Sequence, residues 1–260
     1  MTERTPLIAG NWKMNLDHLQ SIALIQKLAW TLIEKSHDFK DVEVCVIPPF
    51  TALRSAQTLI DAEKFELSIG AQDISKHQAG AYTGEISGQM LSKLAVKYVV
   101  VGHSERRQYH GESDELVRDK VAACFANGLI PIICVGETQE QLESHGPSAI
   151  PVRQILEALK GHESLKEFVV AYEPVWAIGT GQIASPEQAD QVAAEIRSAI
   201  LGEHGELAEQ VRILYGGSVK AGNVASFMQG PNIDGVLVGG ASLDSDEFAG
   251  ISRYKKHIVL

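Results

Sequence analysis

The sequence predicts a single (β/α)₈ barrel that spans residues 1–260. Two patterns carry this prediction: short apolar runs recur along the chain, and segments with helical periodicity separate them. Most runs are continuously apolar rather than alternating, which is typical of parallel strands covered on both faces. About eight strand–helix units in ~250 residues match the usual size of such a barrel. A doubly wound sheet is the structural alternative.

Eight segments fit the strand pattern. Most of them are apolar along their length. The expected strands are residues 6–10, 42–47, 67–72, 98–102, 129–135, 168–172, 211–215 and 235–239.

Helical periodicity is clear between the strands. The first intervening segment places Ile22, Ile25, Ala29, Leu32 and Ile33 on one face. A later segment does the same with a second apolar set, Ala189, Val192, Ala193, Ile196, Ala199 and Ile200. Both faces are expected to pack against the barrel.

Two helices have marked ends. Ser185 can cap the helix that follows it, Pro186 suits the first helical position, and Gln188 completes a capping box. The last helix is expected to open with the acidic residues 244–247 and to close with Lys255 and Lys256, which matches the helix dipole.

The charge balance limits the partners. The formal net charge of −10 argues against binding to nucleic acid or to an anionic membrane surface, since both need a basic footprint. It does not exclude a small anionic substrate, because a few local cations can reverse the field inside a cleft.

The three cysteines, Cys45, Cys124 and Cys134, all lie in apolar runs. No CxxC pair and no Cys/His cluster has metal-ligand spacing, so buried free thiols are expected and a metal is not. Free thiols suit a reducing compartment. The first residues have no apolar signal region and no run is long enough to cross a membrane, so a cytoplasmic protein is expected.

Polar residues gather where the expected strands end. Asn11 and Lys13 follow the first strand, His103 to Arg106 follow the fourth, and Glu173 follows the sixth. Glycines follow the seventh and eighth strands, in GGS (216–218) and at Gly239 and Gly240. Reactive groups of a (β/α)₈ barrel lie at the carboxyl ends of its strands, so these residues are expected to meet there.

Each of these residues also has an ordinary structural interpretation. Lys13 alone fits a solvated surface lysine, and His103 fits a core histidine bonded to a carbonyl. Glu173 fits a strand-end carboxylate before a proline. Together they supply a base, a hydrogen-bond donor and an ammonium. The glycine turns add backbone N–H groups of the kind that bind phosphate.

Residues 179–184, GTGQIA, match the dinucleotide-binding pattern G-x-G-x-x-A after a strand. In that motif the glycines open the helix directly. Here Pro174 and Trp176 intervene after the strand and the helix cap comes later, at Ser185. The match is therefore weak evidence for a nucleotide site.

Five segments resemble the signatures of the triosephosphate isomerase family, in that family's order and over essentially the whole chain. They are GNWKMN, GHSERR, AYEPVWAIGTG, YGGSV and GVLVGGASL. The resemblance implies a TIM barrel that interconverts dihydroxyacetone phosphate and D-glyceraldehyde 3-phosphate without a metal or a cofactor, in glycolysis and gluconeogenesis.

The resemblance also implies a role for each matching residue. Glu173 would be the base and His103 the electrophile, kept neutral by a helix N-terminus. Lys13 would balance the charge of the substrate with Asn11 beside it, and Glu105 would pair with Lys13. The phosphate would lie against the backbone of Gly179, Ser218, Gly239 and Gly240.

Residues 174–180 would form a mobile lid, as the family implies. Pro174 and Ala184 would mark its hinges, and Trp176 and Ile178 would be its apolar closing surface. The C-terminal hinge reads Gln182-Ile183-Ala184, where many family members carry a lysine and a threonine. That departure bears on the rate of opening and leaves the mechanism intact.

The polar segment HQAGAYTGEIS (77–87) follows the third strand. As a free surface loop it would be unremarkable. In the family the matching loop inserts into a twin subunit with the residue at Thr83 near its tip, so a homodimer is implied.

Two other functions compete with this interpretation. One is another phosphate-binding barrel enzyme, such as a sugar-phosphate isomerase or an aldolase; a Schiff-base aldolase would need a lysine where Glu173 stands. The other is a barrel that binds a metabolite without turning it over, which loss of Glu173 or His103 would have favoured.

Overall fold

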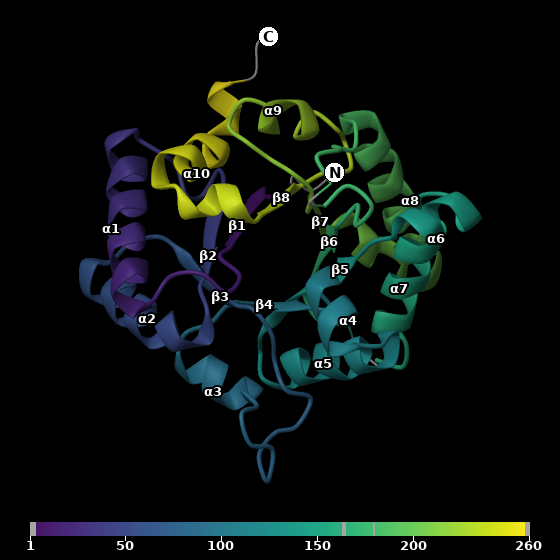
Figure 1. Cartoon of the computed structure of the whole chain (residues 1–260), viewed down its shortest axis with the longest axis horizontal. Coiled ribbons are helices and arrows are strands. Elements are labelled where there is room, and N and C mark those ends of the chain that lie inside the picture. Colours follow the sequence, from purple (N-terminus) through teal and green to yellow (C-terminus); the bar gives the residue numbers. More distant parts are fainter. Residues whose placement is uncertain (1–3, 163–164, 179, 258–260) are drawn as a thin grey trace.

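The computed structural model describes residues 4–162, 165–178 and 180–257. Eight parallel strands close into a barrel in sequence order, and β8 pairs with β1 to complete it (Figure 1). The (β/α)₈ prediction is therefore confirmed, and the doubly wound alternative is wrong. The strands are β1 (Leu7–Asn11), β2 (Glu43–Ile47), β3 (Ser68–Ala71), β4 (Tyr98–Val101), β5 (Ile130–Val135), β6 (Val169–Tyr172), β7 (Arg212–Tyr215) and β8 (Gly235–Val238). Each bound agrees with the sequence prediction to within one residue.

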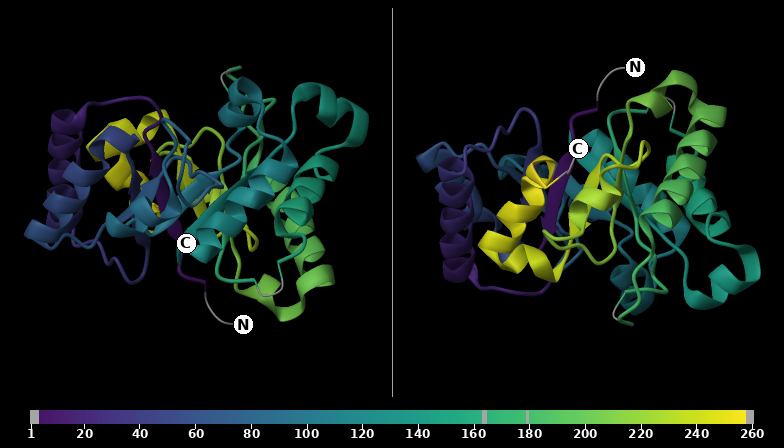
Figure 2. Two further views of the ribbon diagram at one scale, coloured as in Figure 1. Left: turned by 90° about the horizontal axis from the view of Figure 1, so that it is seen from below. Right: turned by 90° about the horizontal axis from the view of Figure 1, so that it is seen from above.

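Helices surround the barrel on its outer side (Figure 2). They are α1 (His18–Glu34), α2 (Phe50–Glu63), α3 (Gly88–Lys93), α4 (Ser104–His110), α5 (Asp114–Ala126), α6 (Gln139–His145), α7 (Ala149–Leu159), α8 (Pro186–His204), α9 (Val224–Phe227) and α10 (Ser245–Ser252). Short 3₁₀ turns complete the described chain: η1 (Gly205–Glu209), η2 (Gly240–Leu243) and η3 (Tyr254–Lys256).

The strands are buried on both faces, which explains their continuous apolar sequence. One face fills the inside of the barrel with side chains such as Leu7, Ala9, Tyr98 and Leu214. The opposite face packs against the helices in a larger cluster. Because residues along a strand alternate between the two faces, neither face tolerates a regular series of polar residues.

Closure of the barrel requires a glycine. Gly235 has φ +155°, and a Cβ atom at this position would lie 2.0 Å from the carbonyl oxygen of Leu7. A side chain would therefore push β8 away from β1 at the pair of strands that closes the cylinder.

The capping predictions are confirmed at α8. The Ser185 side chain accepts a hydrogen bond from the N–H of Gln188, and the Gln188 side chain accepts one from the N–H of Ser185. The last helix is shorter than predicted: α10 ends at Ser252, and Lys255 and Lys256 lie in η3. The predicted face of α1 is also partly wrong, because Ile33 is exposed and Leu28 is buried.

The three cysteines are free and buried, as the sequence predicts. Among the residues with described coordinates, no helix is long and apolar enough to cross a membrane.

Candidate active site

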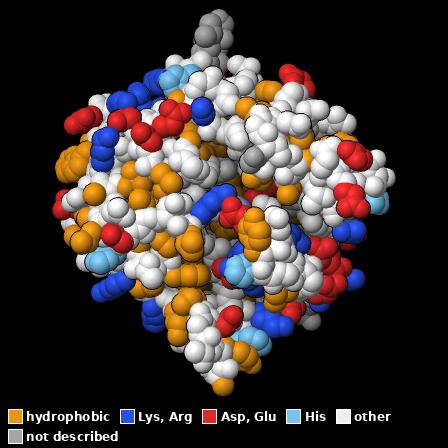
Figure 3. All heavy atoms as spheres, in the orientation of Figure 1, with side chains coloured by type: hydrophobic (Ala, Val, Ile, Leu, Met, Phe, Trp, Pro, Cys, Tyr) orange, Lys and Arg blue, Asp and Glu red, His pale blue; other side chains and the backbone are white. Residues whose placement is uncertain are grey.

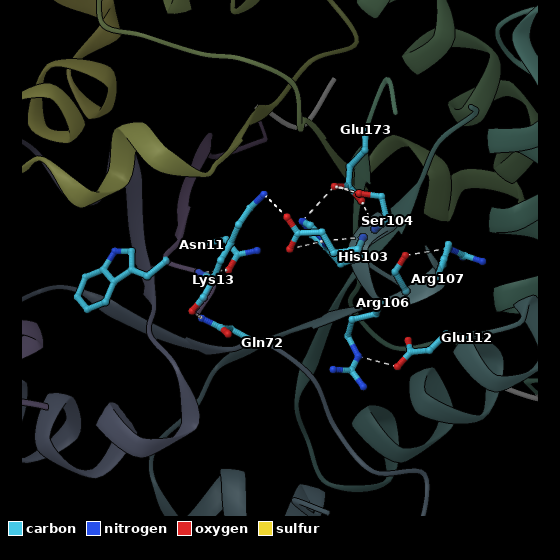
Figure 4. A network of polar contacts seen from close by, with 12 residues as sticks. Asn11, Lys13, Gln72, His103, Ser104, Arg106, Arg107, Glu112 and Glu173 are labelled. Atoms are coloured by element: carbon cyan, nitrogen blue, oxygen red, sulfur yellow. Dashed lines mark hydrogen bonds and ion pairs between the residues drawn. The ribbon is translucent and has the colours of Figure 1, made fainter. Parts of the chain in front are cut away.

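Glu173 follows β6 directly and is buried at the carboxyl end of the barrel. Its N–H donates to the carbonyl of Val135 on β5, which fixes the backbone at the strand end. Its carboxylate accepts two hydrogen bonds from Ser104, at 2.9 Å from the backbone N–H and 3.0 Å from the hydroxyl (Figure 4). These donors are neutral, so they orient the carboxylate without cancelling its charge.

His103 lies beside this carboxylate, with Nε2 3.1 Å from Oε1 of Glu173. The residue caps α4, and its Nδ1 accepts the N–H of Glu105 at 3.2 Å. A nitrogen that accepts an N–H carries no proton, so the proton of the neutral ring is on Nε2. The helix start therefore fixes which ring nitrogen can donate a hydrogen bond toward the barrel axis.

Lys13 has a left-handed backbone, with φ +53°, which costs a non-glycine residue about 1–2 kcal/mol. Three contacts hold it there. The Asn11 side chain accepts its N–H at 3.0 Å, the Gln72 amide donates to its carbonyl at 2.8 Å, and its ammonium lies 2.6 Å from the Glu105 carboxylate. Such strain persists only where the surroundings enforce it, which indicates that the position of the ammonium matters.

These residues share a cavity of about 290 Å³ at the carboxyl end of the barrel. Asn11, Lys13, His103 and Glu173 line one part of it. The rest of the wall is built from residues 216–220, which follow β7, and from residues 237–241, which include the end of β8 and the turn after it. The face seen in Figure 3 is hollowed at its centre, where positive and negative side chains meet.

Glycine lets the wall approach Glu173 closely, because a Cβ at Gly216 would lie 3.0 Å from Cγ of Glu173. Gly239 and Gly240 have no side chain and present backbone to the cavity. The start of η2 at Gly240 also leaves N–H groups that the turn itself cannot satisfy, which is a setting suited to phosphate. Gly179, the fourth predicted phosphate residue, lies outside the described residues.

The segment that follows Glu173 is a series of turns. The N–H of Ala177 donates to the carbonyl of Pro174 at 2.9 Å, and that of Ile178 to Val175 at 3.2 Å. Ile178 lines the cavity, as predicted for one half of the apolar closing surface.

Trp176, predicted as the other half of the closing surface, does not line that cavity in this structure. Its indole N–H donates to Oε1 of Glu137 at 2.8 Å, and its backbone N–H donates to the Glu137 carbonyl at 3.2 Å. The ring also packs against the core. Trp176 therefore anchors the first turn of the segment to the loop after β5.

Glu137 was not predicted from the sequence as a site residue. Burial raises the pKa of its carboxyl group to about 7, and hydrogen bonds from Tyr172 and Trp176 offset burial only in part. Its second oxygen, Oε2, is buried without a partner among the described residues.

Gln72 was also missed as a supporting residue, and Ser104 was predicted at the strand ends but without a role. Ser104 orients Glu173 and Gln72 holds Lys13, and each comes from a different strand end than the residue it supports. The strand-end pattern that identified Asn11 and Glu173 extends to Gln72 as well, because Gln72 directly follows β3.

Within the part of the chain that the structure describes, no group of three or more His, Cys, Asp or Glu side chains is arranged to hold a metal ion. The weak dinucleotide match at 179–184 also gains no support. Apart from Gly179, which is not described, this segment lies in turns and coil, and α8 begins only at Pro186.

The fold and the site together define a class: a (β/α)₈ barrel with a buried carboxylate and a histidine donor in one cavity, facing a glycine-rich wall suited to an anion. Comparison with known proteins identifies one family within that class. The family model for triosephosphate isomerase matches residues 6–255. The chain therefore belongs to the triosephosphate isomerase family, whose members are isomerases.

Relatives named triosephosphate isomerase agree with this over almost their full length. The protein of Leifsonia xyli subsp. xyli is 62% identical over 257 residues, covering 98% of this chain and 99% of the relative. Those of Streptomyces avermitilis and Corynebacterium diphtheriae are each 56% identical, with the same coverage.

Proposed function

We propose that this chain, as a single domain over residues 1–260, interconverts D-glyceraldehyde 3-phosphate and dihydroxyacetone phosphate, as in glycolysis and gluconeogenesis. The observation that carries the proposal is the pair formed by Glu173 and His103, whose Oε1 and Nε2 atoms are 3.1 Å apart in the cavity. A base and a hydrogen-bond donor at one point are what a proton transfer beside a carbonyl requires.

Glu173 would act as the base. Moving a carbonyl by one carbon means removing a proton from the adjacent carbon and returning it to the former carbonyl carbon. One carboxylate can do both if it reaches both carbons from one side. The hydrogen bonds from Ser104 must then exchange for contact with the substrate, which is feasible because both donors are neutral.

His103 would stabilise the enediolate that forms between the two transfers. Its Nε2–H is the only ring proton in the tautomer fixed by Glu105, so it can donate to the substrate oxygens as negative charge develops there. The substrate and product have the same overall oxidation state. The chemistry proposed therefore needs no redox cofactor, and the Nε2–H of His103 would supply the charge stabilisation that a metal ion could otherwise give.

The remaining residues would bind the substrate. Lys13 would balance its charge, with Asn11 holding the lysine backbone and Glu105 its ammonium. The phosphate would lie against Ser218, Gly239 and Gly240, together with Gly179. Residues 174–180 would close over it as a lid with Ile178 toward the cavity, and exclude water from an intermediate that can eject its phosphate.

An assay coupled to glyceraldehyde 3-phosphate tests the function directly. We expect turnover by the unmodified chain, and Glu173→Gln should lower kcat by more than the ~10²–10⁴ typical of one general base, because both proton transfers use it. The substitution keeps the shape of the side chain, so the fold should persist in circular dichroism. Absence of turnover in the unmodified chain, or near-normal turnover in the variant, would contradict the proposal.

We also propose that the chain is a homodimer held by loop 77–87. The loop projects from the rim between β3 and α3 (Figure 1), and its residues 78–85 are all exposed. Gln72, at its root, donates to the carbonyl of Lys13, and the neighbouring Met14 side chain is 95% exposed. A partner loop that covered Met14 would remove this apolar surface from water and support the Lys13 backbone.

Thr83→Arg places a charge near the loop tip and should yield monomers of low activity, measured by sedimentation together with turnover. A surface loop elsewhere offers a control: a charge of the same sign at the exposed Ala95 is expected to leave association unchanged. A fully active monomer would contradict the role of the loop.

The cytoplasm is the compartment we propose, because three buried free thiols suit a reducing environment. Cell fractionation that found the protein in a secreted or membrane fraction would contradict this.

A further inference from the structure

Lys220 is the residue that gives the charged lining of the cavity an excess of positive charge, which favours an anion. Three charged side chains line it: Lys13, Glu173 and Lys220. The Lys13 ammonium shares its charge with Glu105 at 2.6 Å. Apart from Lys220, a phosphate dianion entering the cavity would therefore meet one shared ammonium and the Glu173 carboxylate, on a chain whose net charge is −10.

Lys220 lies in the turn between β7 and α9, two residues after Ser218. The turn is held by its backbone. The N–H of Lys220 donates to the Asn223 side chain at 2.7 Å, and the N–H of Ala221 donates to Glu247 at 2.7 Å. These contacts fix the Cα of Lys220 at the edge of the glycine-rich wall and use none of the atoms of its side chain.

The Lys220 side chain is exposed and makes no ion pair with a carboxylate of the described residues. Glu247, the acid that contacts this turn, binds the N–H of Ala221 instead. Lys220 is thus the one cation in the described cavity lining whose charge is not already offset by a partner.

We infer that Lys220 is a second phosphate-directed cation, which attracts the dianionic substrate to the mouth of the cavity and acts on capture rather than on the chemical step. The inference rests on the proposed isomerase function. Lys13 and Lys220 would act at different places. Lys13, held in a strained backbone conformation by its contacts, acts beside the reacting carbons, whereas Lys220 acts on the phosphate group from the rim of the cavity.

The proposed role of Lys220 can be distinguished from that of Lys13 by its effects on kcat and kcat/KM. A rim cation raises the rate of encounter with an oppositely charged ligand and contributes equally to ground-state and transition-state binding. Its removal should therefore lower kcat/KM and leave kcat nearly unchanged. The effect should fade as salt screens the exposed charge, over a Debye length of about 8 Å at 0.15 M ionic strength.

The test is steady-state kinetics of Lys220→Gln with glyceraldehyde 3-phosphate at low and high ionic strength. We expect kcat/KM to fall about 5-fold at low salt and less than about 2-fold near 0.5 M, with kcat within about 2-fold throughout. Lys220→Arg keeps the charge and should restore kcat/KM. Lys35→Gln is the matched control: it removes the same exposed charge at the end of α1, at the opposite end of the barrel, and should leave kcat/KM unchanged.

A second substrate separates phosphate attraction from a structural effect. D-glyceraldehyde lacks the phosphate, so its slow turnover should be the same in Lys220→Gln and in the unmodified chain, while inhibition by inorganic phosphate should weaken in the variant. The inference is overturned if the unmodified chain is active and Lys220→Gln matches it at every ionic strength. It is equally overturned if Lys35→Gln loses as much, or if turnover of D-glyceraldehyde falls by the same factor. An unmodified chain without isomerase activity would instead refute the proposed function.

Discussion

Two buried carboxylates at opposite ends of the barrel, Glu43 and Glu173, are held in opposite ways. At the amino ends of the strands, Arg212 contacts Glu43 at 3.0 Å and Tyr98 at 2.8 Å, and Lys97 contacts Glu43 at 2.6 Å. At the carboxyl ends, Glu173 contacts Ser104 and the His103 ring and makes no ion pair with a lysine or arginine of the described residues. Cations therefore neutralise Glu43, whereas neutral donors hold Glu173.

The pKa values of two glutamates express the same contrast. Burial raises the pKa of Glu43, but hydrogen bonds from Lys97, Ser68 and Tyr98 outweigh it and lower the value to about 2. Burial of Glu137, near the lid, prevails over its two hydrogen bonds and raises the pKa to about 7. Glu43 is thus fully paired in a way that stabilises the fold, while Glu173 and Glu137 are less completely neutralised and remain able to react or to titrate.

The largest effect that we expect is on catalysis, from substitutions at the carboxyl end of the barrel. His103→Gln should lower kcat by about 10²–10⁴ and raise KM less, because the ring acts on the developing charge. Lys13→Met should damage both constants, since its ammonium also binds the substrate. Neither change should lower the free energy of unfolding by more than about 1 kcal/mol, as measured in urea. An NMR spectrum with His103 protonated on both nitrogens at neutral pH would contradict the assigned role.

The next effect is on stability at the opposite end. Arg212→Met leaves Glu43 buried with one cation fewer. Losing one partner of a buried ion pair costs about 3–5 kcal/mol, and Lys97 should hold the loss here to about 2–3 kcal/mol. Urea unfolding measures it.

The activity of the same variant is its internal control. Turnover at a temperature where the variant is folded should stay near normal, because Arg212 touches nothing in the cavity lining. Adding Glu43→Leu should recover part of the lost stability, since an apolar pair can replace a buried ion pair. Loss of turnover in folded Arg212→Met would contradict the assignment of Arg212 to stability alone.

The smallest effect is a pH dependence from Glu137. Its pKa in the folded protein is about 7, above the ordinary value of 4.5, so the folded state binds more protons between these two pH values. The free energy of unfolding should therefore fall as pH rises, by about 2 kcal/mol between pH 5 and pH 7 from this group alone. Glu43 has the opposite sign: its lowered pKa contributes stability above pH 4.5 that is lost as pH falls toward 2.

Glu137→Gln should remove the loss between pH 5 and pH 7 while keeping an acceptor for Trp176. Urea unfolding of both proteins across that range checks it, with the loss below pH 4.5 expected to persist in the variant. Parallel pH profiles for the variant and the unmodified chain would show that Glu137 does not titrate in this range.

Much of the fold and the site can be predicted from the sequence, because each strand and its end are specified by neighbouring residues. A continuous apolar run specifies a strand buried on both faces, and the polar residues that end such runs must lie at one end of a parallel barrel. Asn11, His103, Glu173 and the glycines after β7 and β8 were found in this way, and the family resemblance gave each a proposed role.

Other contacts join residues far apart in the chain and could be seen only in the folded structure. Ser104 meets Glu173 across 69 positions, and Arg212 meets Glu43 across 169. The role of Trp176 belongs here too, because its type fits a closing surface and only the position of Glu137 turns it into an anchor. The strand pattern fixes where each residue leaves the barrel. Which side chains then pair depends on the register and closure of all eight strands, and no single segment encodes these.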